Sequence, residues 1–244
     1  MAVIFDIDHE AGNLSEYNST VTDSGDLSAH ADAALAGTGY GLNCLIDGTG
    51  SIYGQLTLSS TYTDFRFRFY FDPNSLTMGQ YEAFHVAFIY TSASPWSVAR
   101  IAYTATGELV FEPFNDPGNL SPNYAAITDA PHYIEVYGHR AATNVSADGT
   151  YEWWVDGVSK SIWTGVDNYD LFAMFQLFRI GAVNGVDAGT SGTIYLDELV
   201  IRDDSTEIGP VEEGGGSIKI DRGIQLGIAR GMYKRMVPGG GTYP

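Results

Sequence analysis

Residues 150–204 constrain the fold of this chain more than any other stretch. Residues 151–158 alternate aromatic and polar side chains and contain Asp156-Gly157, a pair that adopts the positive φ angles of a tight β-hairpin turn. A second aromatic-rich strand is expected over residues 175–181, and a third over residues 192–204. The order of strand, turn, strand and strand predicts the closing part of an antiparallel β-structure.

The rest of the chain repeats this pattern. Short apolar runs, separated by Gly, Pro, Asn and Asp, are typical of a sandwich or barrel. They cover residues 3–6, 41–46, 52–58, 65–71, 84–90, 97–103, 108–111 and 132–139. With 244 residues and 44% hydrophobic composition, the chain can bury one large core. We therefore expect an all-β fold, a two-sheet antiparallel β-sandwich (jelly roll) with an extended C-terminal arm.

Alternation within the strands separates their two faces, because successive side chains point to opposite sides of a sheet. Phe65, Phe67, Phe69 and Phe71 share one face of their strand. In the same way Tyr151, Trp153 and Val155 oppose Glu152, Trp154 and Asp156. One face of this sheet is thus predicted to lie in the core, and the other to be polar and aromatic.

The pattern after residue 150 resembles laminin-G-like and concanavalin-A-like jelly rolls. In that superfamily a "strand, V-D-G turn, strand" unit precedes an "R-I-G" strand and a closing "L-D-E-L" strand, which match Val155–Gly157, Arg179–Gly181 and Leu196–Leu199. Members include carbohydrate-binding modules, adhesion domains and phage virion surface proteins. Such sandwiches often hold a structural Ca²⁺. Carried over residue by residue, the resemblance implies Glu10, Asn13 and Asp197 as its ligands, and the alternative is that these residues cap turns or face solvent.

Composition divides the chain into three parts. We expect a concanavalin-like domain over residues 1–208, a Gly-rich hinge over 209–216 and a basic, apolar assembly arm over 217–244. Residues 1–216 hold 7 Lys and Arg against 29 Asp and Glu, whereas residues 217–244 hold 5 against 1. The arm residues expected to dock on a neighbouring subunit are Ile218, Lys219, Ile220, Arg222, Ile224, Leu226, Ile228, Arg230, Tyr233, Lys234 and Arg235. The alternative is a last strand folded back on its own sandwich.

The formal charge of −18 disfavours nucleic acid as a partner of the domain. No apolar stretch is long enough for a membrane-spanning segment, and the first residues lack the pattern of a signal peptide. Cys44 is the one cysteine, so an intrachain disulfide is impossible, and its apolar surroundings predict a core position.

The polar face described above is a candidate carbohydrate platform, since aromatic rings stack on sugars while planar polar groups bind hydroxyls. Its candidate residues are Arg66, Arg68, Tyr70, His85, Tyr137 and Trp154. The alternative is an outer face covered by long side chains or by a neighbouring subunit.

Sequence motifs for catalysis are scarce. There is no compact E-x-D-x-E run of a jelly-roll hydrolase, no G-x-S-x-G elbow, no P-loop and no zinc-binding spacing. Glu135 and Glu152 fall on the polar faces of their strands and form the only candidate carboxylate pair that we identify for a polysaccharide hydrolase or lyase.

The sequence therefore favours a non-enzymatic structural subunit of a virion or filament surface, such as a phage decoration, head-fibre or tail-associated protein. We expect it to be a homo-oligomer, or to bind other virion proteins through its C-terminal arm, in a virion or extracellular assembly. A carbohydrate-binding module that recognises glycans is the alternative, and a polysaccharide hydrolase or lyase is the second alternative.

Overall fold

The protein is an antiparallel β-sandwich in a computed structural model that describes residues 3–58, 62–91, 97–173 and 175–211. Contacts within the chain divide it into a unit over Met1–Gly214 and a unit over Gly215–Pro244. The second unit, with every arm residue named above, lies outside the described residues. The predictions for the hinge beyond Val211 and for the arm therefore stay predictions.

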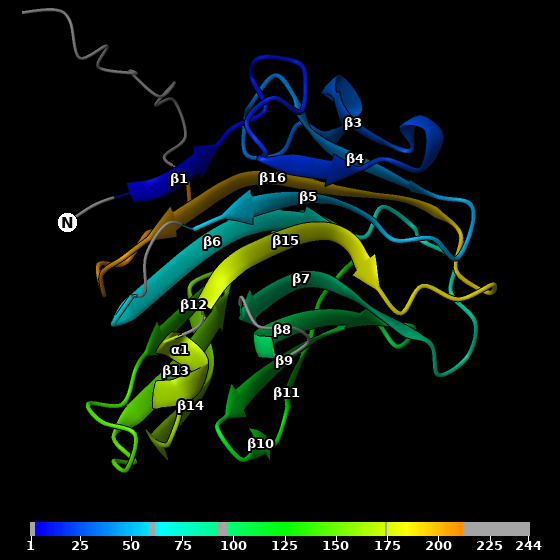
Figure 1. Cartoon of the computed structure of the whole chain (residues 1–244). Helices are drawn as coiled ribbons and strands as arrows, with labels where there is room; N and C mark the ends of the chain where they lie inside the picture. Colours follow the sequence, from blue (N-terminus) through cyan, green and yellow to red (C-terminus); the bar gives the residue numbers. More distant parts are fainter. Residues whose placement is uncertain (1–2, 59–61, 92–96, 174, 212–244) are drawn as a thin grey trace, which may run out of the picture. The chain divides into compact units, whose positions relative to one another are not determined.

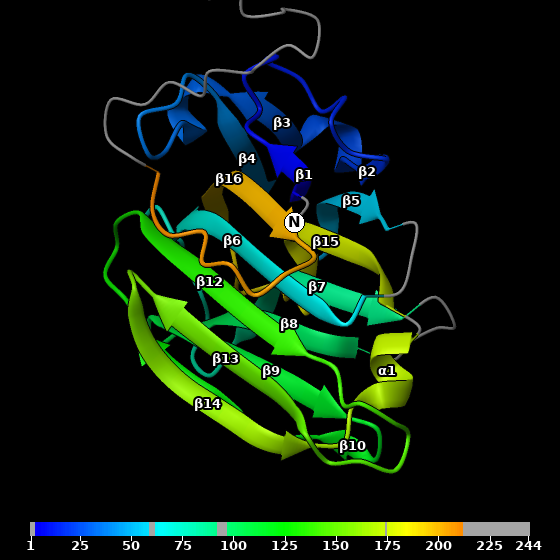
Figure 2. The same ribbon diagram turned by 90° about the vertical axis from the view of Figure 1, so that its left-hand side faces the viewer.

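Sheet A has eight strands. Its order is β14 (Val158–Val166), β13 (Gly149–Val155), β12 (His132–His139), β6 (Asp64–Asp72), β16 (Gly192–Arg202), β4 (Gly41–Ile46) and β3 (Leu27–His30), with β1 (Val3–Ile7) also paired to β16. Figure 2 looks onto the outer face of this sheet.

Sheet B also has eight strands and lies behind sheet A in Figure 2. Its order is β10 (Gly118–Asn119), β9 (Glu108–Asn115), β8 (Ser97–Thr104), β7 (Ala83–Thr91), β15 (Phe175–Asn184), β5 (Ile52–Thr57) and β2 (Ser19–Val21), with β11 (Asn123–Ala126) also paired to β9. Figure 1 shows the two layers together with the short helix α1 (Tyr169–Ala173). Two single-turn 3-10 helices, η1 (Asp23–Gly25) and η2 (Ala31–Ala33), complete the described elements.

The predicted fold class is confirmed, and so is the predicted hairpin. Asp156 (φ 52°) and Gly157 (φ 72°) connect β13 to β14, so both turn residues occupy the left-handed region that this turn requires. The strands begin and end within a few residues of the apolar runs, because period-two alternation is a local property of the sequence.

Aromatic rings from both sheets fill the core. Phe65, Phe67, Phe69 and Phe71 are all buried, as the alternation of β6 predicts. Phe67 meets Phe178 of sheet B edge to face at 5.0 Å. Burial raises the pKa of the Cys44 thiol to about 12, so this predicted core cysteine stays protonated at neutral pH. Within the residues that the structure describes, no helix is long and apolar enough to span a bilayer.

Candidate functional site

The outer face of sheet B carries a row of side chains that the strand register aligns. Gln55 of β5 pairs with Arg179 of β15, Arg179 with Phe88 of β7, Phe88 with Arg100 of β8, and Arg100 with Glu112 of β9. Their neighbours in sequence, such as Leu56, Ile180, Ile101 and Phe111, point inward and are buried. Adjacent β-strands thus fix a polar and aromatic row whose backbone is held by the core beneath it.

Arg179 lies at the centre of this face between two tyrosines. Its Cζ atom is 4.6 Å from the ring centroid of Tyr53 and 4.8 Å from that of Tyr90. Its Nε donates to Gln55 Oε1 at 2.8 Å, and Gln55 Nε2 in turn donates to Ser19 Oγ at 3.2 Å. Among the described residues, Arg179 has no carboxylate partner, so its positive charge is not compensated by an adjacent acid.

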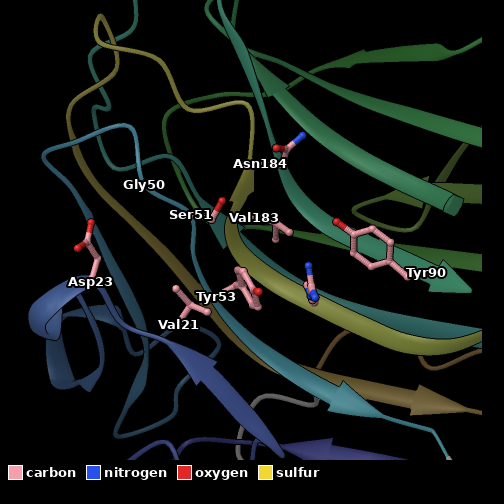
Figure 3. Close-up of a pocket in the computed structure, with 9 residues that line it drawn as sticks. Val21, Asp23, Gly50, Ser51, Tyr53, Tyr90, Val183 and Asn184 are labelled. Carbon is pink, nitrogen blue, oxygen red and sulfur yellow. The ribbon is translucent and has the colours of Figure 1, made fainter. Parts of the chain in front are cut away.

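A pocket of about 450 Å³ opens beside Arg179. Figure 3 shows Asp23 at one end of this pocket and Tyr90 at the other, with Tyr53 and Ser51 between them. Its volume is in the range usual for small-molecule sites, about 300–1,000 Å³. Its lining residues are Val21, Asp23, Gly50, Ser51, Tyr53, Tyr90, Arg179, Val183 and Asn184.

The Tyr90 phenol keeps its proton at neutral pH. Burial raises the pKa of its phenol, and the charge and hydrogen bond of Arg179 oppose that effect without cancelling it. The Tyr90 ring stacks on Phe88 at 4.7 Å with an interplanar angle of 6°, which fixes its orientation. A protonated, oriented phenol beside an uncompensated guanidinium is suited to donate a proton to a leaving group of a bound anion.

Arg100, at the other end of the row, is already neutralised. Its Nε lies 2.8 Å from Glu112 Oε2, and His85 Nε2 lies 3.2 Å from the same oxygen. Burial alone would raise the pKa of Glu112, but the hydrogen bond from His85 and the charge of Arg100 outweigh it and lower the pKa. Glu112 therefore stays ionised, and Arg100 has less charge to offer to a ligand than Arg179 has.

Five of the six predicted carbohydrate-binding residues lie together on sheet A. Arg66, Arg68 and Tyr70 are on β6, Tyr137 is on β12 and Trp154 is on β13. The expectation that His85 shares their face needs correction, because β7 belongs to sheet B. Alternation within a strand identifies faces, but it does not show to which sheet the strand belongs.

The outer face of sheet A over β6 and β12 is covered by a strap, residues 205–211, which follows β16. Figure 2 shows this orange segment crossing in front of β6 and β12. Arg66 Nη1 donates to Ser205 O at 3.0 Å, and Val211 N donates to Tyr70 Oη at 3.0 Å. The chain itself thus covers this part of the sheet, and Gly209, expected in a hinge, is buried. Glycan binding at these residues stays a prediction.

Glu135 is the anchor of the strap. Its carboxylate accepts hydrogen bonds from Ile208 N and Gly209 N, both at 2.9 Å, and pairs with Arg66 Nε. The Arg66 guanidinium also lies over the Trp154 ring at 4.6 Å. Both oxygens of Glu135 are engaged and the residue is 2% exposed, whereas Glu152 accepts from Ser159 Oγ at the surface. Glu135 therefore has no free carboxylate oxygen to act as a base, whereas among the described residues only Oε1 of Glu152 is engaged.

The three residues implied as calcium ligands all accept hydrogen bonds from the protein. Asp197 accepts from Leu35 N, Thr38 Oγ1 and Glu198 N, while Glu10 Oε1 accepts from Gly39 N and Tyr40 N. Asn13 closes a local turn by accepting from Ser15 N. Within the described ranges no group of three or more His, Cys, Asp or Glu side chains is placed to hold a metal ion. Calcium binding stays a prediction from the resemblance.

Comparison with known proteins finds similarity in structure only. No protein-family model and no curated protein matches the sequence. An endo-β-1,4-glucuronan lyase from the fungus Trichoderma reesei superposes with a TM-score of 0.62 at 15% identity, over 86% of this chain and 100% of that one. Alginate lyase Aly36B superposes at 0.57 and 13% identity, over 85% and 98%. A structure of botulinum neurotoxin type C, a toxin whose cell entry depends on interaction with two ganglioside molecules, superposes with a TM-score of 0.52 at 12% identity, over 84% of this chain and 49% of that one.

These similarities correct two predictions. A non-enzymatic role and a structural role on a virion or filament surface are both wrong, because several of the similar structures are polysaccharide lyases and nothing in the comparison indicates a virion subunit. At these identities the similarity establishes the fold alone, a β-sandwich of the jelly-roll kind that is consistent with a concanavalin-like superfamily.

The residues of the pocket escaped the sequence analysis although a signal for them exists. Tyr53 and Gln55 are polar residues that alternate with apolar ones in the run at residues 52–58. Arg179 is a polar residue within the apolar run at residues 175–181. Assigning faces on these strands as well would have aligned the three side chains on one face. Their shared sheet and the neighbouring β7 come only from the strand order.

Proposed function

We propose that this protein is a polysaccharide lyase that cleaves an acidic, uronate-containing polysaccharide on the outer face of sheet B. The observation that carries the proposal is Arg179, an uncompensated guanidinium held between Tyr53 and Tyr90 at the wall of a 450 Å³ pocket. The similarity in fold to glucuronan and alginate lyases supports the proposal. Membership of the concanavalin-like superfamily is part of what we propose.

Arg179 binds the uronate carboxylate. A guanidinium forms charge-assisted hydrogen bonds with a carboxylate, and neutralising that carboxylate acidifies the proton on the neighbouring C5 carbon. Gln55 accepts from Nε of Arg179 and Tyr90 also hydrogen-bonds the guanidinium, and the substrate carboxylate binds its remaining N–H groups. Tyr53 and Tyr90 form hydrophobic walls on either side of the guanidinium and exclude water from the ion pair.

The two tyrosines carry out the proton transfers. Tyr53, acting as its phenolate, takes up the C5 proton and becomes a neutral phenol, the C5 electron pair forms the C4=C5 double bond, and the C4–O4 bond breaks. Tyr90 donates its phenolic proton to the departing O4 oxygen, so that no water is consumed. The raised pKa of Tyr90 supports its role as the acid, since the phenol keeps its proton at neutral pH.

The test measures the ultraviolet absorbance of the 4,5-unsaturated uronate released from glucuronan, alginate and mixed uronate polymers. We expect product from the wild-type protein and a loss of about 10²–10³-fold in kcat/KM for Arg179→Ala. Arg140→Ala is the matched control, because Arg140 also stacks on a tyrosine, Tyr169 at 4.9 Å, but does not line the pocket. Binding without unsaturated product from any polymer would contradict a lyase and favour a carbohydrate-binding module on this face.

A further inference from the structure

The pocket beside Arg179 is lined by charged side chains of opposite sign, Arg179 and Asp23. Asp23 lines the end opposite Tyr90, and its side chain is exposed. Partial burial raises the pKa of Asp26, and the charges of Asp47 and Asp23 raise it further, so these three carboxylates are close enough to interact, although only Asp23 lines the pocket. The pocket therefore has a positive wall at Arg179 and an acidic rim at one end.

The opposite side of the row offers no spare positive charge. Arg100 is two strands away from Arg179, with Phe88 between them in register. Because strands lie about 4.8 Å apart, the two arginines are separated by roughly 10 Å across the sheet. However, Glu112 lies 2.8 Å from Arg100 and stays ionised. A second carboxylate on this side would meet a pair that is already neutral.

Arg179 is thus the one cation of this face, within the described residues, whose charge is available to a substrate. A sugar bound next to the Arg179 subsite meets either the acidic rim at Asp23 or the neutral pair at Arg100. Like charges placed side by side in a cleft oppose binding, and that repulsion is a common means of specificity.

We propose that the site selects a heteropolysaccharide in which a uronate is linked to an uncharged sugar, and discriminates against a homopolyuronate, with Asp23 as the specificity-determining residue. This inference rests on the proposed function and deepens it. The uronate carboxylate binds Arg179, and the uncharged neighbour presents hydroxyl groups to the Asp23 carboxylate, which accepts their hydrogen bonds. In a homopolyuronate that neighbour would carry a carboxylate toward the acidic rim.

The experiment compares two defined tetrasaccharides of equal length, one of glucuronate alone and one alternating glucuronate with an uncharged hexose. We expect wild type to cleave the alternating tetrasaccharide with the higher kcat/KM. Asp23→Asn should raise kcat/KM for the glucuronate tetrasaccharide about fivefold at low salt, because it removes one repulsive charge. Asparagine also tolerates the positive φ of this position (40°), so the fold should be retained. The effect should fall on KM more than on kcat.

Two controls make the outcomes distinct. Asp32→Asn removes one carboxylate that is 74% exposed and outside the pocket, and it should leave the ratio of the two substrates unchanged. Raising the ionic strength to about 0.5 M should shrink the wild-type discrimination, since charges are screened beyond a few ångströms there. Equal cleavage of both tetrasaccharides, or a ratio that Asp23→Asn leaves unchanged at low salt, would overturn this inference alone. Absence of product from both, and from every polymer tested, would overturn the proposed function.

Discussion

The two outer faces of the sandwich are built from the same residue types and differ in what lies over them. Each carries arginines stacked on aromatic rings beside a glutamate. On sheet A, Arg66 is paired with the buried Glu135 and the strap covers both. On sheet B, Arg179 has no carboxylate partner in the described ranges and faces a pocket. Composition alone therefore does not distinguish a structural arginine–aromatic cluster from a candidate active site.

The physical difference is how the charge of the guanidinium is compensated. A buried arginine needs a carboxylate because an unpaired charge in a medium of low polarity is strongly unfavourable. Arg66, 6% exposed, meets that requirement within the protein. Arg179 is only partly buried, and Gln55 gives it a hydrogen bond but no charge. Its charge remains available for an anionic ligand.

The largest expected effect is on the stability of sheet A. Glu135→Ala leaves Arg66 buried without its partner and removes the acceptor for Ile208 N and Gly209 N. We expect the free energy of unfolding to fall by about 3–5 kcal/mol. Urea denaturation followed by circular dichroism measures this.

Glu112→Ala is the matched change on sheet B and should cost about 1 kcal/mol or less, since that pair is about a quarter exposed. Equal losses for the two variants would show that the two faces do not differ as described.

The second effect separates the faces by activity. Tyr90→Phe removes the phenolic proton donor, and we expect kcat on a uronate substrate to fall about 10²-fold or more with little change in stability. Trp154→Ala, on the covered face, should leave kcat unchanged in the folded protein. Initial rates at saturating substrate measure both. A rate loss in Trp154→Ala equal to that of Tyr90→Phe would move the active site to sheet A.

The third effect is a pH dependence on sheet A. Burial raises the pKa of Glu198 to about 7, against an opposing effect of Arg68 3.7 Å away, while Asp197, Asp6 and Asp8 raise it further. A raised folded-state pKa means that the neutral acid is favoured by the fold. The contribution of protonated Glu198 to stability is therefore complete below the pKa of the unfolded state, near 4.5, and is lost as the pH rises through about 7.

Glu198→Gln should reduce the fall in stability between pH 5 and pH 8 by roughly 1–2 kcal/mol, after allowance for solvent screening, while the loss of the ionic partner of the buried Arg68 lowers stability at every pH. Thermal unfolding of both proteins between pH 5 and pH 8 tests this. Parallel pH profiles for the two proteins would refute the assignment to Glu198.

The smallest effect concerns the strap. Gly209 adopts φ +69°, and a Cβ added at this position would meet no heavy atom within 4 Å, so Gly209→Ala introduces backbone strain without a clash. We expect a loss of about 1 kcal/mol. Faster hydrogen exchange of the Ile208 amide, with unchanged exchange in β15, would accompany it. Rapid exchange of that amide in the wild-type protein would show that the strap is not held by Glu135.

Much of the fold was predictable because strand patterning is local. The four phenylalanines of β6 and the alternation around Trp153 predicted buried positions, and Asp156-Gly157 predicted the hairpin. The candidate site was predicted less well. His85 was placed with the residues of sheet A, and Tyr53, Gln55 and Arg179 were not identified, because pairing between strands far apart in sequence leaves no local pattern.

The amino-acid sequence by itself determined the all-β class, the hairpin and the inward faces, since each follows from side chains one or two residues apart. Only the tertiary structure decided which outer face is covered and which holds a pocket. It placed Arg66, Glu135 and residues 205–211 together, and it aligned Gln55, Arg179 and Phe88 across three strands. The physical reason is that the environment of a charged side chain, paired and covered or open to a ligand, depends on long-range strand order and on the path of the chain after its last strand.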